Sequence, residues 1–284
     1  MNKKTSSGFT IMETMIVLAI TGVMFISVVL LINGKQQQAQ FQTSVKDVQA
    51  QVRQVMTETS AGFNQLGNNT CGISGGKPAL SPGTSDTIGT NANCVFLGKT
   101  LIFSQDKDSF IVAPVVGLRQ PVATEFDGQF VPDLNRSKPI ISTTLSAATK
   151  KLQFGLAPVA MYLNDDVTQK VGSVSFVSTP GTKDTNLAAG SQTTMSQNLN
   201  LVAITQGSSL SNSLTTEKGA IENALQNGTV VNNKYINSTD DKVKVSICFK
   251  SGTTGQSYLL SIGSGGNGIG FESKIFNDGK CGAA

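Results

Sequence analysis

The chain contains no histidine and no tryptophan among its 284 residues. Without histidine there is no Ser-His-Asp or Cys-His nucleophile, no imidazole ligand for a metal and no ordinary general base near neutral pH. Carboxylate or lysine chemistry remains open to such a chain. The commonest catalytic arrangements are excluded, however, and we therefore expect a protein that is not an enzyme.

Charge is also scarce, because only 14% of the residues are charged and the net charge is +4. Two of the positive charges, Lys3 and Lys4, lie in the first eight residues, and the remainder of the chain is close to neutral. Binding to nucleic acid through phosphate neutralisation is therefore not predicted. Ser, Thr, Asn and Gly replace the missing charges, a composition typical of an extracellular, β-rich surface with many turns.

The four cysteines include no CxxC pair; they are Cys71, Cys94, Cys248 and Cys281. Zinc sites normally use two close ligand pairs, so the wide gaps favour disulfides on the oxidising side of a membrane. Three pairings are open. Loop closure favours Cys71 with Cys94 and Cys248 with Cys281, each closing a loop of roughly 25–35 residues and contributing about 3–4 kcal/mol in the chain-entropy model.

From Phe9 to Ile32 the sequence is apolar except for Glu13 and a few small hydroxyl residues. At about 1.5 Å per residue this stretch forms about 36 Å of helix, enough to span a bilayer with some tilt. Lys3 and Lys4 are expected to hold the N-terminus in the cytoplasm, which places everything after Asn33 outside. Neither an A-x-A-like cleavage site nor a lipobox cysteine follows the run.

Glu13 is unexpected in this run. A carboxylate at membrane depth costs on the order of 2.5–3.5 kcal/mol on insertion scales, so acids in such positions usually have a function and a partner. A purely structural alternative is an acid at the cytoplasmic edge whose side chain snorkels to the interface in a simple membrane anchor.

A short basic leader precedes the residues Gly8-Phe9-Thr10-Ile11-Met12-Glu13, and an unbroken apolar run follows them. This pattern resembles the class III signal of the type IV pilin and type II secretion pseudopilin superfamily. The resemblance covers about the first 30 residues. It implies that a prepilin peptidase cuts after Gly8, removing residues 1–8 as a leader, and methylates the new amino terminus at Phe9.

The resemblance also supplies a partner for the acid. It implies that the Glu13 carboxylate of one subunit neutralises the amino terminus of Phe9 in an adjacent subunit. In a low dielectric each unpaired charge is very costly, so this pairing would penalise subunits in the wrong axial register. The expected partners are other pilin or pseudopilin subunits, the prepilin peptidase and, before assembly, the cytoplasmic membrane.

Residues 33–61 carry a stripe of mostly apolar side chains at steps of four and three residues, which predicts an amphipathic continuation of the membrane helix. The helix is expected to end near Gly62, giving a rod from Phe9 of roughly 75–80 Å. No proline interrupts it, and Gly22 and Gly34 are its only weak points. The same spacing fits a two-stranded coiled coil, but the resemblance favours packing on the chain's own head. The stripe consists of Phe41, Val45, Val48, Val52, Val55 and Thr59.

The remaining residues, 62–284, predict a β-rich extracellular head. Residues 63–93 are rich in Gly, Asn, Ser and Pro and are expected to form one long loop closed by Cys71 and Cys94. A weak helix is predicted at 215–227. The fold class is therefore α+β, with a long N-terminal helix packed on a mainly antiparallel sheet. Strands are predicted at 94–103, 109–118, 151–163, 171–178, 199–205, 243–250, 257–262 and 271–276.

The strand at 243–250 alternates, with Val245, Ile247 and Phe249 on one face and Cys248 on the other. A bond from Cys248 to Cys281 would therefore hold the C-terminal tail across the outer face of the sheet. This arrangement resembles the disulfide-bounded C-terminal region of many pilins.

Two motifs suggest ligands without specifying them. Gly263, Gly265 and Gly268 match G-x-G-x-x-G, but the residues that follow predict a strand instead of the helix a dinucleotide site needs. We therefore expect a hairpin loop and no cofactor. Paired aspartates lack the spacing of a calcium loop and are expected in solvated turns, without a metal; they are Asp106 with Asp108, Asp165 with Asp166, and Asp240 with Asp241.

The function expected from the resemblance is that of a structural subunit of a type IV pilus or a type II secretion pseudopilus. A head of over 200 residues is large for a major pilin and favours a minor subunit. The protein would be a single-pass membrane precursor and then part of an extracellular or periplasmic filament. The alternative is a membrane-anchored adhesin or binding module that never polymerises. The sequence does not identify what the head binds.

Overall fold

A computed structural model describes residues 10–61, 69–82, 94–105, 107–118, 137–142, 147–178, 199–204, 210, 214–227, 244–265, 268–277 and 279–281. Gly8 and Phe9 lie outside these ranges, as do Lys3, Lys4 and Asp106. Asp240, Asp241 and Val243 are outside them too.

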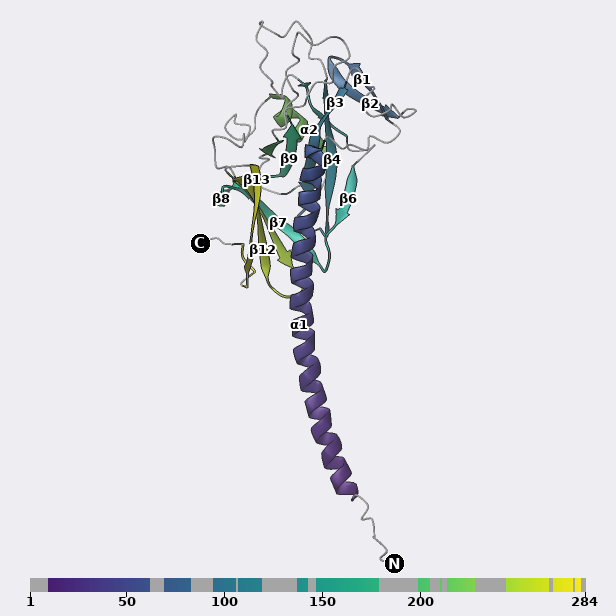
Figure 1. Cartoon of the computed structure of the whole chain (residues 1–284), viewed down its shortest axis with the longest axis vertical. Helices are drawn as coiled ribbons and strands as arrows, with labels where there is room; N and C mark the ends of the chain where they lie inside the picture. The colour runs from purple at the N-terminus through teal and green to yellow at the C-terminus, as the bar shows by residue number, and fades with distance from the viewer. Residues whose placement is uncertain are drawn as a thin grey trace, which may run out of the picture.

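One long helix, α1 (Ile11–Ser60), forms the N-terminal part of the structure. Its 50 residues correspond to about 75 Å at 1.5 Å per residue, close to the predicted rod. The helix passes through Gly22 and Gly34 without a break because no proline removes a backbone donor. It ends at Ala61, whose N–H donates to the Thr57 carbonyl at 2.9 Å. Figure 1 shows its N-terminal half projecting from the head as a bare rod.

The head contains two larger antiparallel sheets and a small hairpin, which confirms the α+β class. The first sheet has the order β10-β9-β3-β4-β5, and β6 also pairs with β4. Its strands are β3 (Cys94–Phe103), β4 (Ser109–Leu118), β5 (Ile140–Ile141), β6 (Ala148–Lys151), β9 (Ser173–Ser178) and β10 (Leu199–Ile204). The bounds of β3 and β4 are those predicted from the apolar runs.

The second sheet has the order β13-β12-β11-β7-β8. Its strands are β7 (Leu156–Leu163), β8 (Asp166–Lys170), β11 (Lys244–Ser251), β12 (Ser257–Gly265) and β13 (Gly268–Phe276). The elements outside the two sheets are the hairpin of β1 (Asn69–Ser74) and β2 (Lys77–Pro82) and the helix α2 (Leu214–Asn227). This helix lies where the weak helical pattern predicted one.

The first sheet is covered on both faces because its strands alternate with period two. Leu101 and Phe103 of β3 pack in the cluster that contains the α1 stripe and the apolar face of the second sheet. Ile102, between them, belongs to a second cluster with Ile221 and Leu225 of α2. The sheet is therefore sandwiched between α1 on one side and α2 on the other.

Gly98 allows β3 and β9 to approach closely. A Cβ atom at this position would lie 2.0 Å from the Phe176 carbonyl oxygen, so only glycine fits without a shift of the backbone. The pairing of β3 with β4 changes register at the same place, between Phe96 and Gly98. Glycine here therefore marks a bulge against which the neighbouring strand packs.

The prediction of one long loop at 63–93 is wrong in its middle, where β1 and β2 pair in register. Gly75 and Gly76, both with positive φ, make the turn. Two adjacent residues with positive φ form the type of turn that suits a two-residue hairpin. The Gly-Gly pair was the signal for this hairpin in the sequence, but the neighbouring residues are so rich in turn formers that the pair did not stand out.

The segment between β4 and β9 also differs from the prediction. The strand predicted at 151–163 is two strands, β6 and β7, separated by a turn in which Phe154 and Gly155 have positive φ. Strand β8 was not predicted. It pairs with β7 through a turn at Asn164 and Asp165, which both have positive φ, a conformation that Asn and Asp adopt more readily than most residues.

Candidate functional site

The projecting half of α1 is the most unusual surface of the described chain. Residues 11–32 contain fifteen large apolar side chains that are each between 38% and 81% exposed. Monomeric soluble proteins rarely leave a continuous apolar surface of this extent uncovered. Among the described residues, α1 is the helix that is long and apolar enough to cross a membrane. The fifteen are Ile11, Met12, Met15, Ile16, Val17, Leu18, Ile20, Val23, Met24, Phe25, Ile26, Val28, Val29, Leu31 and Ile32.

The hydroxyl groups in this half are satisfied within the helix. Thr14 Oγ1 donates to the Ile11 carbonyl, Thr21 Oγ1 to the Val17 carbonyl and Ser27 Oγ to the Val23 carbonyl, each at 2.9 Å. Such back-bonding removes the demand for an outside partner. Glu13 is thus the one side chain between Ile11 and Ile32 whose charge calls for a partner outside the helix.

Glu13 occupies the first turn of α1. The Thr10 side chain caps the helix by accepting a hydrogen bond from the Glu13 N–H at 3.3 Å. Thr10 and Glu13 match the S/T-x-x-E spacing of a capping box, in which the acid also favours the helix N-terminus electrostatically. This second role for Glu13 was missed from the sequence, although the Thr-x-x-Glu spacing was visible there.

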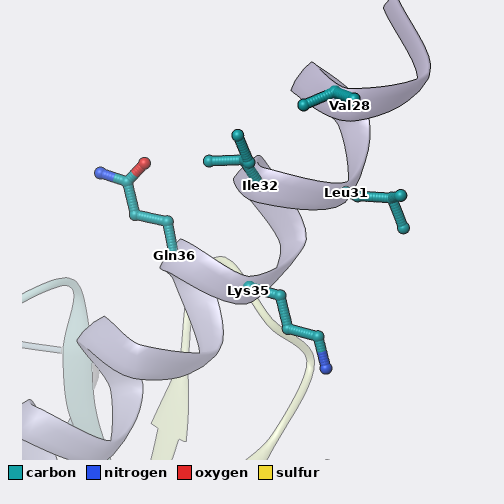
Figure 2. Close-up of a pocket in the computed structure, with 5 residues that line it drawn as sticks. All are labelled: Val28, Leu31, Ile32, Lys35 and Gln36. Carbon is teal, nitrogen blue, oxygen red and sulfur yellow. The ribbon is translucent and has the colours of Figure 1, made fainter. Parts of the chain in front are cut away.

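The apolar surface ends where the helix approaches the head. Val28, Leu31, Ile32, Lys35 and Gln36 line a pocket on the outside of this single helix. In Figure 2 the side chains of Lys35 and Gln36 point to different sides of the helix, directly after the last large apolar residues. The apolar run therefore changes to the polar continuation within about one helical turn.

The C-terminal half of α1 packs on the head, which decides between the two arrangements that the stripe left open. Phe41, Val45, Val48, Val52, Val55 and Thr59 are all at most 7% exposed. Two further contacts at the edges of the stripe join α1 to the head. Ser44 Oγ donates to the Gln153 carbonyl at 2.6 Å, and the Arg53 guanidinium lies 5.2 Å from the centre of the Phe271 ring. The stripe therefore packs on the chain's own head.

An ion pair lies at the end of this interface, near the C-terminus of α1. Lys99 on β3 donates to Glu58 on α1, and Gln54 Nε2 donates to the same carboxylate at 2.7 Å. Burial raises the pKa of the Glu58 carboxyl, but the hydrogen bonds from Lys99 and Gln54 outweigh it and hold the pKa below its ordinary value of 4.5. The pair therefore stabilises the folded state only while Glu58 is ionised.

Acid is expected to weaken this contact. Because the folded-state pKa of Glu58 is lowered, the stabilisation is complete above pH 4.5 and is lost as the pH falls through the folded value. Because Lys99 supplies a large part of the interaction that lowers this pKa, the loss should be smaller in a Lys99→Met variant. Between pH 6 and pH 3 the wild type should therefore lose about 1 kcal/mol more unfolding free energy than the variant. Urea unfolding of the full chain in detergent at the two pH values measures the difference.

Lys151→Met is the matched control for that experiment. The Lys151 and Asp108 charged atoms lie 3.8 Å apart, and their side chains are 72% and 60% exposed, so their ion pair contributes little. This variant should follow the wild type at both pH values. An equal acid loss in Lys99→Met and wild type would show that the Glu58 pair does not contribute to stability.

The four cysteines form two disulfides in the structure, Cys71 with Cys94 and Cys248 with Cys281. This is the connectivity that loop closure favours. The first bond ties the β1–β2 hairpin to the start of β3. The second joins β11 to the C-terminal tail, where Cys281 Sγ lies 3.6 Å from the Tyr258 carbonyl oxygen. Both bonds lie in the head, away from the projecting helix.

Cys248 lies on the face of β11 opposite Val245, Ile247 and Phe249. Those three belong to the main core cluster, whereas Cys248 is outside it but still only 5% exposed. The C-terminal tail is therefore held on the outer face of the second sheet.

The structure places the other described sequence motifs in hairpins and turns, and Asp106, Asp240 and Asp241 lie outside the described residues. Gly263, Gly265 and Gly268 lie in the β12–β13 hairpin, which is strand on both sides. Asp165 is engaged by Lys244 and Ser246, and Asp166 accepts from the Thr168 N–H at 2.9 Å. In the described part of the chain, no group of three or more Cys, Asp or Glu residues is placed to hold a metal ion.

Comparison of the chain with protein-family models, with curated protein sequences and with solved structures finds no match in any of the three.

Proposed function

We propose that this protein is a structural, non-catalytic subunit of a type IV pilus or a type II secretion pseudopilus, and within that class a minor subunit. One observation supports this proposal above the others: a single continuous helix is buried in the head along one half and exposed on all sides along its apolar other half (Figure 1). A head carried on an apolar rod is a unit that can be held in a membrane and then packed among the rods of other subunits.

The apolar rod requires an apolar environment at each stage. Lipid covers it in the precursor, since the run is long enough to span the hydrocarbon core. In a filament the same surface is covered by the rods of other subunits. Transfer from lipid to a helix bundle leaves the apolar burial nearly unchanged, so packing and charge pairing decide the arrangement of the subunits.

Charge pairing gives Glu13 its role in this function. Cleavage after Gly8 creates a positive amino terminus at Phe9. The Glu13 carboxylate of a neighbouring subunit neutralises this amine within the apolar bundle, and a wrong axial register leaves both charges unpaired at high cost. The proposal therefore requires both the cut and the acid.

Intact mass tests the cut. Expressed in cells with a prepilin peptidase, the mature chain should lack residues 1–8 and carry one additional methyl group on Phe9. In cells without the peptidase it should retain all 284 residues. Mature protein from assembled fibres that still begins at Met1 would exclude the filament subunit.

The position of Glu13 in the first turn of α1 favours one second candidate, a membrane-anchored adhesin or binding module that never polymerises. An acid in the first turn interacts favourably with the N-terminal end of the helix dipole, so Glu13 has a local role that needs no neighbouring subunit. In that case substitutions at Glu13 would act through the stability of the first turn and not through pairing with another subunit.

A further inference from the structure

We propose that Lys35 is an intersubunit partner of Glu13, and that this pair sets a second, longer axial offset between copies of the chain. The inference rests on the filament function proposed above. It assigns a partner to Lys35, the one basic side chain between the start of α1 and Phe41; this stretch is called the rod below.

Between residues 10 and 45 the sequence has two charged side chains, Glu13 and Lys35. Both are exposed, and among the described residues neither forms an ion pair within the chain. The rod thus carries one acid and one base at opposite ends of an apolar surface. Assembly of several rods covers that surface and brings both charges into an environment of lower dielectric.

The helix geometry excludes a pair within one copy. Glu13 and Lys35 are about 33 Å apart along the axis and about 40° apart around it. They therefore lie on nearly the same side of the rod, too far apart to interact with each other. A partner for either charge must come from a second chain.

The orientation of the copies decides the offset. Chains inserted in the membrane with the same orientation are parallel, so rods with no offset place like charges together. An offset of about 33 Å along the axis, with the second rod turned about its axis so that the charged sides face each other, places Glu13 of one copy beside Lys35 of the next. Each copy then uses Glu13 toward one neighbour and Lys35 toward another. Such head-to-tail contacts do not close on themselves and propagate as an open filament.

This pair is compatible with the pairing of Glu13 and the Phe9 amine. An ionised carboxylate has two oxygens and accepts several hydrogen bonds, so it can bind the amine of one neighbour and the ammonium of another. Lys35 also follows directly on the apolar residues Val28, Leu31 and Ile32 (Figure 2). Its charge therefore lies at the edge of the surface that a neighbouring rod would cover.

A positional exchange tests the pair. The double variant Lys35→Gln with Gln36→Lys keeps the composition and the charge at the membrane boundary but moves the charge about 100° around the helix. We expect normal insertion and cleavage but at least a tenfold lower yield of sheared filaments, on the order expected for loss of a close charge pair. Lys35→Arg, the control, should retain assembly. Wild-type yield from the exchanged variant would overturn the inference and leave Lys35 a membrane-boundary residue only.

Crosslinking within filaments gives an independent measurement. Val17→Cys and Ala39→Cys lie one turn beyond Glu13 and Lys35, at the same spacing, and a short bismaleimide should link them into a ladder of multimers. Pairing Val17→Cys with Gln37→Cys turns the second thiol about 160° away and should give few links. Filaments that form without a ladder from the first pair would overturn the inference. Failure of the unsubstituted, processed chain to enter filaments would instead overturn the proposed function.

Discussion

Replacing Glu13 with glutamine is expected to reduce filament assembly by at least about a hundredfold, because removing one partner of a buried ion pair leaves the other charge uncompensated at a cost of about 3–5 kcal/mol. In the proposed filament that charge is the amino terminus of Phe9 in the neighbouring subunit. Cleavage after Gly8 and insertion in the membrane should persist, since the basic leader and the apolar run are unchanged. The amount of processed chain in sheared filaments, divided by the amount in membranes, measures the effect.

Glutamine is chosen because it separates the charge from the helix cap. Gln suits the third helical position after an N-cap threonine, and it keeps the N–H from which Thr10 accepts, so Glu13→Gln retains the cap and loses the charge. Thr10→Ala makes the opposite change, because it removes the side chain that accepts the Glu13 N–H hydrogen bond and leaves the carboxylate. We expect Thr10→Ala to assemble nearly as the wild type does. Wild-type assembly of Glu13→Gln would contradict the proposed charge pairing, whereas absence of the wild-type chain from filaments would favour the anchored binding module.

Val52→Asp is expected to destabilise the head by more than about 3 kcal/mol, because a carboxylate is transferred to a site with no water and no partner. Val52 is 0% exposed and lies in the stripe of α1 that packs against both large sheets. Urea unfolding of the full chain in detergent should show the loss, and the head should become sensitive to protease.

The same substitution on the projecting half provides the control. Val28 is 51% exposed on the same helix, so Val28→Asp should leave the unfolding free energy of the head unchanged in detergent. Its effect should appear in the membrane, where a second acid in the apolar run opposes insertion. Similar destabilisation of the head by both variants would contradict the division of α1 into a buried half and a projecting half.

Several features of the fold could be predicted because their signals are local. The stripe at Phe41, Val45, Val48 and Val52 repeats with the period of a helix, and each of its members is buried as expected. The predicted strands 94–103 and 109–118 coincide with β3 and β4 because each is a continuous apolar run bounded by turn residues.

The hairpins were harder to predict. Strand β1 precedes a turn in which Gly75 and Gly76 have positive φ, and strand β8 follows a turn in which Asn164 and Asp165 have positive φ. In a chain this rich in Gly, Asn and Ser, turn residues are too frequent to show which of them join paired strands. Pairing depends on the partner strand, and the local composition of the loop does not contain that information.

The candidate site divides in the same way. The sequence by itself determined the apolar rod, the isolated acid at Glu13 and the amphipathic continuation, because run length and helical period are properties of neighbouring residues. Only the tertiary structure decided that the stripe packs on the chain's own head, that Lys99 meets Glu58 and that Cys248 meets Cys281. These contacts join residues far apart in the chain, and their geometry follows from how the sheets and α1 pack together.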